Sequence, residues 1–348
     1  MKSLFYCLLS LYWHVGIAAE QKRQKEGYFG NLKSAFINDD EGLGIFLNNS
    51  AHRKTVESIR IYIPKCGWLK KHSFPALQSL AFYNGKLQEI LDILPSLKTP
   101  SLNHISFQGP NIQGPYPQDP IVMPTITTLH IGNQCTIKDL NLFKVLKLPA
   151  LESLDIRRAT IESFQGIEHI AQSLRSLELV RGDFAQFKGH GFQAIFPLLE
   201  KMDIQCHDLK NFNLLKGMIA PKLEKLKCNF SDLDFNDKNV FQGLIELQAP
   251  KLSYLPLDIS IDAKNPEKLA ALSSTLIKLD RAFKTLKKQL VQKYPHKWQS
   301  ESSSVQTSLE VTIYVFETDK EKMLDALKMK IDPSISITFN IMTPFPGK

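Results

Sequence analysis

One short apolar pattern recurs along the middle of the chain and limits its fold more than any other feature. Each copy places apolar residues at its first, fourth and sixth positions, as Leu77, Leu80 and Phe82 do. The first apolar residues of eight copies are Leu77, Leu102, Ile126, Leu151, Leu174, Leu199, Leu223 and Leu252. Successive copies are 25, 24, 25, 23, 25, 24 and 29 residues apart. A steady period of this length means that each copy is one unit, which must stack on its neighbours to bury its apolar side.

The end of each copy predicts a β-strand. Its last two apolar residues are separated by one residue, so both side chains point to one face of the strand and their neighbours to the other. A weaker copy, with Val56, Ile59 and Ile61, precedes the series. About ten positions after each first apolar residue, a further one is expected to close the opposite side of the unit: Leu87, Ile112, Ile137, Ile161, Phe184, Leu209 and Leu233.

Over residues 56–260, this period and the L-x-x-L-x-L pattern resemble the leucine-rich repeat superfamily. The resemblance implies an α/β fold in which about eight to nine repeats form a curved solenoid, with a parallel β-sheet on the concave face. Members of the family often carry Asn or Cys eight residues after the first Leu. This chain has Gly85, Pro110, Gln134, Ala159, Gly182, His207 and Ser231 there. The loop amides must therefore find other partners.

The N-terminal residues have the features of a secretory signal peptide. Lys2 is followed by an apolar run that ends in the small residues Ala18 and Ala19, before a polar stretch. We therefore expect residues 1–19 to be a signal peptide, residues 20–55 to form an N-terminal cap, and the protein to be secreted or exported. The alternative is a buried N-terminal helix in a cytoplasmic protein. No other run approaches the length of a transmembrane span.

A basic amphipathic helix is predicted within residues 261–298. Asn265 and Pro266 are residue types that start helices, and Pro295 stops this one after about Tyr294. Its apolar residues form one seam: Leu269, Leu272, Leu276, Leu279, Phe283, Leu286 and Leu290. We expect the seam to pack on the end of the repeats or on the C-terminal segment. The alternative is a homodimer through helix 265–294.

Most of the net charge of +8 lies in that helix, because residues 264–297 alone carry +7. The rest of the 348-residue chain is therefore nearly neutral, and its basic character does not indicate a nucleic-acid-binding protein as a whole. Residues 299–308 are polar and rich in Ser, as linkers are. Residues 309–348 contain two alternating apolar segments around a capping box at Thr318, and we expect a small β-α-β unit there.

No catalytic signature is present. The chain lacks the usual hydrolase, zinc-protease, phosphate-loop and dinucleotide motifs, so we expect no enzyme, no catalytic residue, no cofactor and no small-molecule substrate. His130, Cys135, Cys206 and His207 occupy non-equivalent positions in different repeats, and we predict no metal site. Cys66, Cys135, Cys206 and Cys228 are scattered along the repeats and are expected to be free buried thiols.

The outward strand positions are the remaining candidates for a functional site. They are neutral in the first repeats and charged in the later ones, where Asp155, Glu178 and Asp203 should form an acidic column. The candidate partner-binding residues are Glu152, Asp155, Arg157, Arg175, Glu178, Glu200, Asp203 and Glu224. We expect non-enzymatic recognition of a protein partner through the concave face. The alternative is nucleic-acid or anionic-surface binding through the basic helix 264–297, at Lys284, Lys287 and Lys288.

Overall fold

The fold is known from a computed structural model. The structure describes residues 33–63, 66–83, 85–187, 189, 191–207, 209–230, 233–234, 237, 239–262, 266–293, 306–316 and 335–342. The predicted signal peptide at residues 1–19 and the start of the cap region, residues 20–32, lie outside the described residues, and so do residues 299–305 of the predicted linker.

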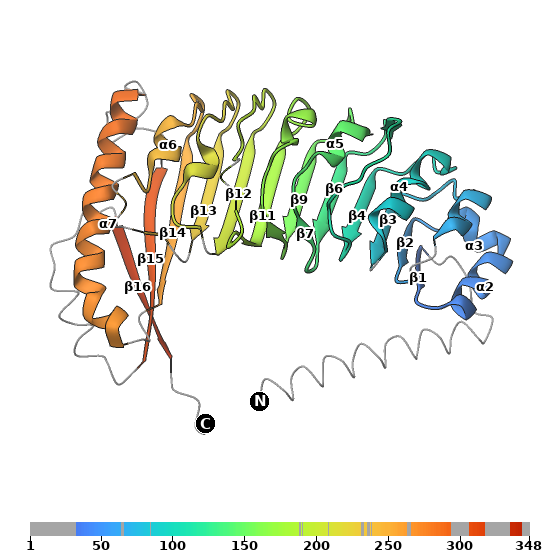
Figure 1. Ribbon diagram of the computed structural model, residues 1–348, viewed down its shortest axis with the longest axis horizontal. Coiled ribbons are helices and arrows are strands. Elements are labelled where there is room, and N and C mark those ends of the chain that lie inside the picture. Colours follow the sequence, from blue (N-terminus) through green and yellow to red (C-terminus); the bar gives the residue numbers. More distant parts are fainter. Residues whose placement is uncertain are drawn as a thin grey trace.

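Parallel strands lie side by side in one long sheet that runs the length of the molecule (Figure 1). In spatial order these strands are β1 (Ser34–Ile37), β2 (Ser58–Ile61), β3 (Ser79–Tyr83), β4 (His104–Gln108), β6 (Thr128–Gly132), β9 (Ser153–Arg157), β11 (Ser176–Asp183), β12 (Lys201–His207), β13 (Lys225–Phe230), β14 (Tyr254–Asp262), β15 (Gln306–Phe316) and β16 (Ile335–Met342). Within the described residues the sheet does not close on itself. The chain therefore has an α/β fold with a large parallel sheet, which is consistent with a repeat solenoid.

The register of this sheet follows the repeat. Leu129, Leu154 and Leu177 hold the same motif position and are direct partners across β6, β9 and β11. All three are fully buried, whereas Ser153 before Leu154 is partly exposed. The predicted strand register is therefore confirmed. We call the side of the sheet that carries the motif leucines the buried face, and the opposite side the open face.

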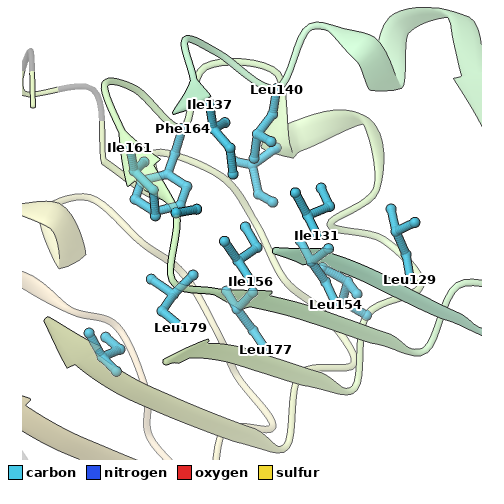
Figure 2. Close-up of a cluster of buried hydrophobic side chains, with 14 of the residues drawn as sticks. Leu129, Ile131, Ile137, Leu140, Leu154, Ile156, Ile161, Phe164, Leu177 and Leu179 are labelled. Carbon is cyan, nitrogen blue, oxygen red and sulfur yellow. The ribbon is translucent and has the colours of Figure 1, made fainter. Parts of the chain in front are cut away.

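A second apolar layer covers the buried face. Figure 2 shows Ile137, Leu140, Ile161 and Phe164 lying across from the leucines and isoleucines of β6, β9 and β11. Ile137 and Ile161 lie in β7 (Thr136–Ile137) and β10 (Thr160–Ile161), which pair in parallel. The expected closing residues are all buried. Burying two layers of apolar side chains against each other is the main source of stability in such a stack.

The loops satisfy their amides by bonding directly to the neighbouring repeat. Gln134 N donates to Arg158 O at 2.9 Å, and Gly109 N donates to Gly132 O at 2.8 Å. These bonds take the place of a buried Asn ladder. Gly166 has a φ of 100° and its Cα lies against the Leu140 backbone, so a side chain there would meet both a strained conformation and a collision.

From β2 to β14, the segments between the main strands hold only short helices, short strands and turns in their described residues. The helices are α4 (Leu87–Leu91), α5 (Leu142–Val145) and α6 (Gln242–Glu246), and the 3-10 turns are Gly67–Lys71, Leu94–Ser96, Ile167–His169 and Asn213–Leu215. A further two-stranded ladder joins β5 (Ile121–Val122) and β8 (Leu146–Lys147). No helix in the described part of the chain has both the length and the apolar character needed to cross a bilayer.

The N-terminal end of the sheet adds one strand before the first repeat. β1 pairs in parallel with β2, and the chain between these two strands forms α2 (Asp40–Asn48) and α3 (Ser50–Thr55). The Asp39 side chain caps α2 by accepting a hydrogen bond from Gly42 N at 2.7 Å. Phe46 of α2 stacks with Phe74 and covers the end of the core.

At the other end of the sheet lies the long helix α7 (Pro266–Lys293) (Figure 1). Its seam residues Leu272, Leu276, Leu279, Phe283, Leu286 and Leu290 are buried in the same core as the strand residues. Lys293 Nζ donates to Ile245 O at 2.6 Å and to Leu247 O at 2.8 Å, which ties the helix to the segment around α6. The seam is therefore covered within one chain, and a homodimer through the seam would require α7 to detach.

The C-terminal strands lengthen the repeat sheet. β15 pairs in parallel with β14, and β16 pairs in parallel with β15. The sequence alone does not show how the predicted β-α-β unit packs on the repeats. The pairing shows that its first strand joins the edge of the repeat sheet at β14. The helix expected between the two strands, around Met323 to Leu327, lies outside the described residues.

Candidate functional site

The candidate site lies on the open face, where successive strands bring equivalent outward residues into rows. Glu178 of β11 is in register with Asp155 of β9 and with Asp203 of β12. The predicted acidic column is therefore formed. Lys227 of β13 continues the same row.

Asp155 is the centre of a hydrogen-bonded network on this face. His130 Nδ1 donates to Asp155 Oδ2 at 2.9 Å, and Arg157 Nε donates to both carboxylate oxygens at 2.7 and 2.8 Å. Arg157 Nη2 reaches Glu178 Oε2 on the next strand at 3.2 Å. The His130 and Asp155 side chains are each 16% exposed. The network therefore holds these groups in fixed positions on the surface.

This network sets the charge state of the site. Burial would raise the pKa of Asp155, but the hydrogen bonds from His130 and Arg157 outweigh it and hold the pKa below its usual value. The same contact with Asp155 raises the pKa of Arg157. Asp155 is therefore ionised at neutral pH, and its charge is largely neutralised by Arg157.

Gly132 makes room for the histidine of this network. A Cβ atom at position 132 would lie 2.8 Å from His130 Nε2 and 2.8 Å from Arg157 O. Any side chain at this position would push the His130 ring from its place. His104, one strand before, is partly buried, and burial followed by the nearby His130 lowers its pKa.

A second arginine joins charged residues that directly precede β9, β11 and β12. Arg175 Nη1 lies 2.7 Å from Glu200 Oε1, and Arg175 Nε lies 3.9 Å from Glu152 Oε1. All three side chains are roughly half exposed, so these pairs contribute little to stability. They order the charged surface instead. Glu224 is exposed beside this group.

The N-terminal part of the open face is aromatic. The rings of Tyr62 and Tyr83 stack with their centroids 4.2 Å apart, and the Arg60 guanidinium lies 5.1 Å from the centroid of Phe36. Burial, followed by the neighbouring Tyr83, raises the pKa of Tyr62 to about 12. Phe36 is 37% exposed. Aromatic and arginine side chains of this kind are enriched in protein interfaces.

Lysines gather at the C-terminal part of the same face. Lys201 of β12, Lys225 of β13 and Tyr254 of β14 are partners in register and form one row across three strands. Lys227 lies two residues after Lys225 on the same side of β13. All three lysines are exposed, and Tyr254 is 39% exposed.

The structure thus brings four of the eight predicted partner-binding residues together on the open face: Asp155, Arg157, Glu178 and Asp203. The other four, Glu152, Arg175, Glu200 and Glu224, directly precede β9, β11, β12 and β13. Many of the eight pair with one another. The pairing of Asp155 with Arg157 follows from period two, since residues two apart share one face of a strand. The predicted site leaves out the lysine row, although alternation along β13 puts Lys225 and Lys227 on the face opposite Leu226 and Cys228. It also leaves out the aromatic group, because Phe36 precedes and Tyr62 follows the weak copy of the motif at residues 56–61.

The predicted basic surface on α7 is separate from the open face. Lys284 and Lys288 are exposed, and Lys284 Nζ pairs with Asp280 Oδ2 at 2.7 Å within the helix. Of Lys287, only its place in α7 is described. Among the described residues, no group of three His, Cys, Asp or Glu side chains is placed to bind a metal ion. Cys66, Cys135, Cys206 and Cys228 are buried free thiols, as predicted.

No protein-family model matches this chain, and no curated protein matches it either.

Proposed function

We propose that this chain is a leucine-rich repeat solenoid protein that recognises a protein partner through its open face, which corresponds to the concave face of such a solenoid. The proposal includes no catalysis. The repeat period of the sequence and the parallel register of the strands support the assignment to leucine-rich repeats. A stack of this kind offers an extended surface without needing a pocket.

One observation carries the functional part of the proposal. The open face holds polar and aromatic side chains in fixed arrangements over many consecutive strands, from the Tyr62–Tyr83 stack to the Asp155–Arg157–Glu178 network. The stacked rings and the ion pairs between strands are ordered before any partner binds. Surfaces with side chains ordered before binding lose less entropy when a partner docks.

The test is capture of partners from the native source by the purified protein. The variant Glu178→Lys with Asp203→Lys reverses two charges of the acidic column and leaves the buried face unchanged. The control variant Glu89→Lys with Asp119→Lys reverses two exposed charges away from the open face. We expect wild type and control to capture the same protein and the column variant to lose it. Loss in the control alone would place binding elsewhere.

Ionic strength gives a second measurement of the same interaction. Exposed charges on the open face should speed association with a complementary partner. This effect is screened within about 8 to 10 Å at physiological ionic strength. We therefore expect the association rate constant to fall as salt is raised, and the column variant to show a weaker salt dependence.

A second candidate function rests on α7. Arg281, Lys284 and Lys288 are exposed on the side of the helix away from its buried seam, which suits nucleic acid or another anionic surface. Retention on heparin that is lost on reversing Lys284, Lys287 and Lys288 would support this function. Retention that survives the reversal would exclude it.

We also propose export of the protein, from the sequence of residues 1–19 alone. N-terminal sequencing of the native protein tests this proposal. Export predicts a mature chain that begins near Ala19 or Glu20, and recovery of intact Met1 would contradict it.

A further inference from the structure

Three lysines of the open face differ from Arg157 and Arg175, because in the part of the chain that the structure describes they form no ion pair. Arg157 and Arg175 each contact two carboxylates. Within the described part of the chain, Lys201, Lys225 and Lys227 have no salt bridge or side-chain hydrogen bond. The arginines thus serve the internal network of the face, and the lysines are available to a ligand.

The placement of these lysines favours an anion between them. Lys201 and Lys225 are direct partners in register, so their Cα atoms are about 4.8 Å apart. Two exposed ammonium groups on adjacent strands repel each other. A carboxylate that docks beside both would remove this repulsion and gain two attractive contacts.

The carboxylates around the lysines are mostly engaged elsewhere. Glu200 pairs with Arg175 at 2.7 Å, and Asp258 accepts a hydrogen bond from Asn229 Nδ2 at 2.8 Å. Asp203 lies in register with Lys227 and accepts from Gln205 Nε2 at 3.4 Å. Their negative charge still alternates with the lysines. Such a surface repels a uniform polyanion and suits a ligand with separate, spaced carboxylates.

We propose that Lys201, Lys225 and Lys227, with Tyr254 beside them, dock an acidic segment of the protein partner in an extended conformation. This inference rests on the proposed function of the open face. In an extended peptide, acidic residues two apart are about 6.6 Å from each other, and so are Lys225 and Lys227 on β13. The two spacings match.

Tyr254 gives this site an apolar contact. It occupies the row of Lys201 and Lys225 and is 39% exposed, so its ring faces the same space as the two ammonium groups. A tyrosine ring buries a large area at a low cost in side-chain entropy, and tyrosine is enriched among the residues that dominate protein interfaces. We therefore expect an apolar residue next to the acidic ones in the docked segment.

The inference is tested by fluorescence anisotropy with a labelled decapeptide of alternating Glu and Ser. The site variant is Lys201→Gln, Lys225→Gln and Lys227→Gln. The matched control is Lys284→Gln, Lys287→Gln and Lys288→Gln on α7. We expect wild type and control to bind the peptide with the same Kd within twofold. The site variant should bind about tenfold more weakly, since each exposed charge pair contributes a fraction of that change.

Further probes separate the remaining outcomes. A peptide of alternating Gln and Ser should not bind, and a DNA duplex should bind more weakly than the acidic peptide. Equal binding by the site variant, loss only in the α7 control, tighter DNA binding through the three lysines, or no peptide binding would each overturn the inference. The far-UV circular dichroism and melting temperature of both variants show whether they fold.

Failure here is distinguishable from failure of the proposed function. If the acidic peptide does not bind but the variant Glu178→Lys with Asp203→Lys still loses the natural partner, the open face is the binding face and only the acidic segment is wrong. If neither experiment shows an effect, the open face is not the binding face.

Discussion

His130 and Asp155 occupy the same row on neighbouring strands, and the Nδ1–H of His130 donates to Asp155 Oδ2 over 2.9 Å. The negative charge of Asp155 also affects the pKa of a second histidine, His104. His104, on the other side of β6, titrates under the influence of burial and of His130, which lower its pKa, and of Asp155, which raises it.

The titration of His104 is therefore a first prediction. We expect its pKa to lie below 6.5, and Asp155→Asn to lower the pKa further, because the variant removes a negative charge that favours the protonated ring. NMR titration of the histidine ring signals measures both values, with His104→Gln to assign the resonance. Asp203→Asn, two strands beyond Asp155, should leave the pKa unchanged.

The lowered pKa of His104 also determines how this residue makes the stability of the fold depend on pH. A neutral His104 favours the folded state, so its contribution is complete above pH 6.5 and is lost as the pH falls from 6.5 through the folded-state value. A rise in the pKa of His104 in Asp155→Asn would contradict the geometry of the network.

A second prediction concerns the strand register. Leu154 is fully buried between Leu129 and Leu177, so Leu154→Ala should lower the free energy of unfolding by about 2 to 5 kcal/mol through lost burial and a cavity. Ser153→Ala, on the open face of the same strand, should change it by less than about 0.5 kcal/mol. Urea denaturation measures both variants. Equal losses would mean that β9 is shifted by one residue.

The attachment of α7 provides a third prediction. Lys293→Met removes two hydrogen bonds to the carbonyls of Ile245 and Leu247, and we expect it to cost about 1 to 3 kcal/mol. Lys288→Met, on the exposed side of α7, is the matched control and should cost little. Thermal and urea unfolding compare the two.

The same helix gives a separate check on oligomeric state. Leu279 is buried within its own chain, so the loss of stability in Leu279→Ala should not depend on protein concentration. A loss that grows on dilution would show that the seam contacts a second copy, as in the alternative of a homodimer.

Cysteine reactivity is a fourth prediction. Burial raises the pKa of Cys66 and of Cys135 to about 11, and raises those of Cys206 and Cys228 well above the usual value. Little thiolate is present at pH 8, and the sulfurs are inaccessible. We expect iodoacetamide to leave all four unmodified in the folded protein and to modify them in urea, as read by peptide mass spectrometry. Modification of Cys206 without urea would place it at the surface.

The repeat made the central strands predictable from sequence. Equivalent motif residues such as Leu154 and Leu177 must both face the core. Alternation within each strand and the constant period therefore allow only one register between neighbouring strands. The seam of α7 was predictable for a similar reason, since its leucines recur at helical spacing between clear start and stop residues.

Other parts follow from contacts that no local pattern encodes. β1 was not predicted, because Ala35 and Ile37 are too few apolar residues to mark a strand, and it forms by pairing with β2. The ion pair between Arg157 and Glu178 depends on how far a long side chain reaches across strands. The extension of the sheet by β15 depends on a contact about fifty residues away from β14.

The tie between Lys293 and the carbonyls around α6 has a consequence for how the molecule unfolds. In a linear array each unit is held only by its neighbours, so local opening starts where an end unit lacks a partner and spreads inward. α7 packs on the core at the C-terminal end of the sheet, and α2 and α3 lie at its N-terminal end. Amide hydrogen exchange should then be slowest in the middle of the array, around β9 and β11, and fastest toward its two ends. Loosening α7 would move the fast-exchanging boundary inward, strand by strand, toward the lysine row.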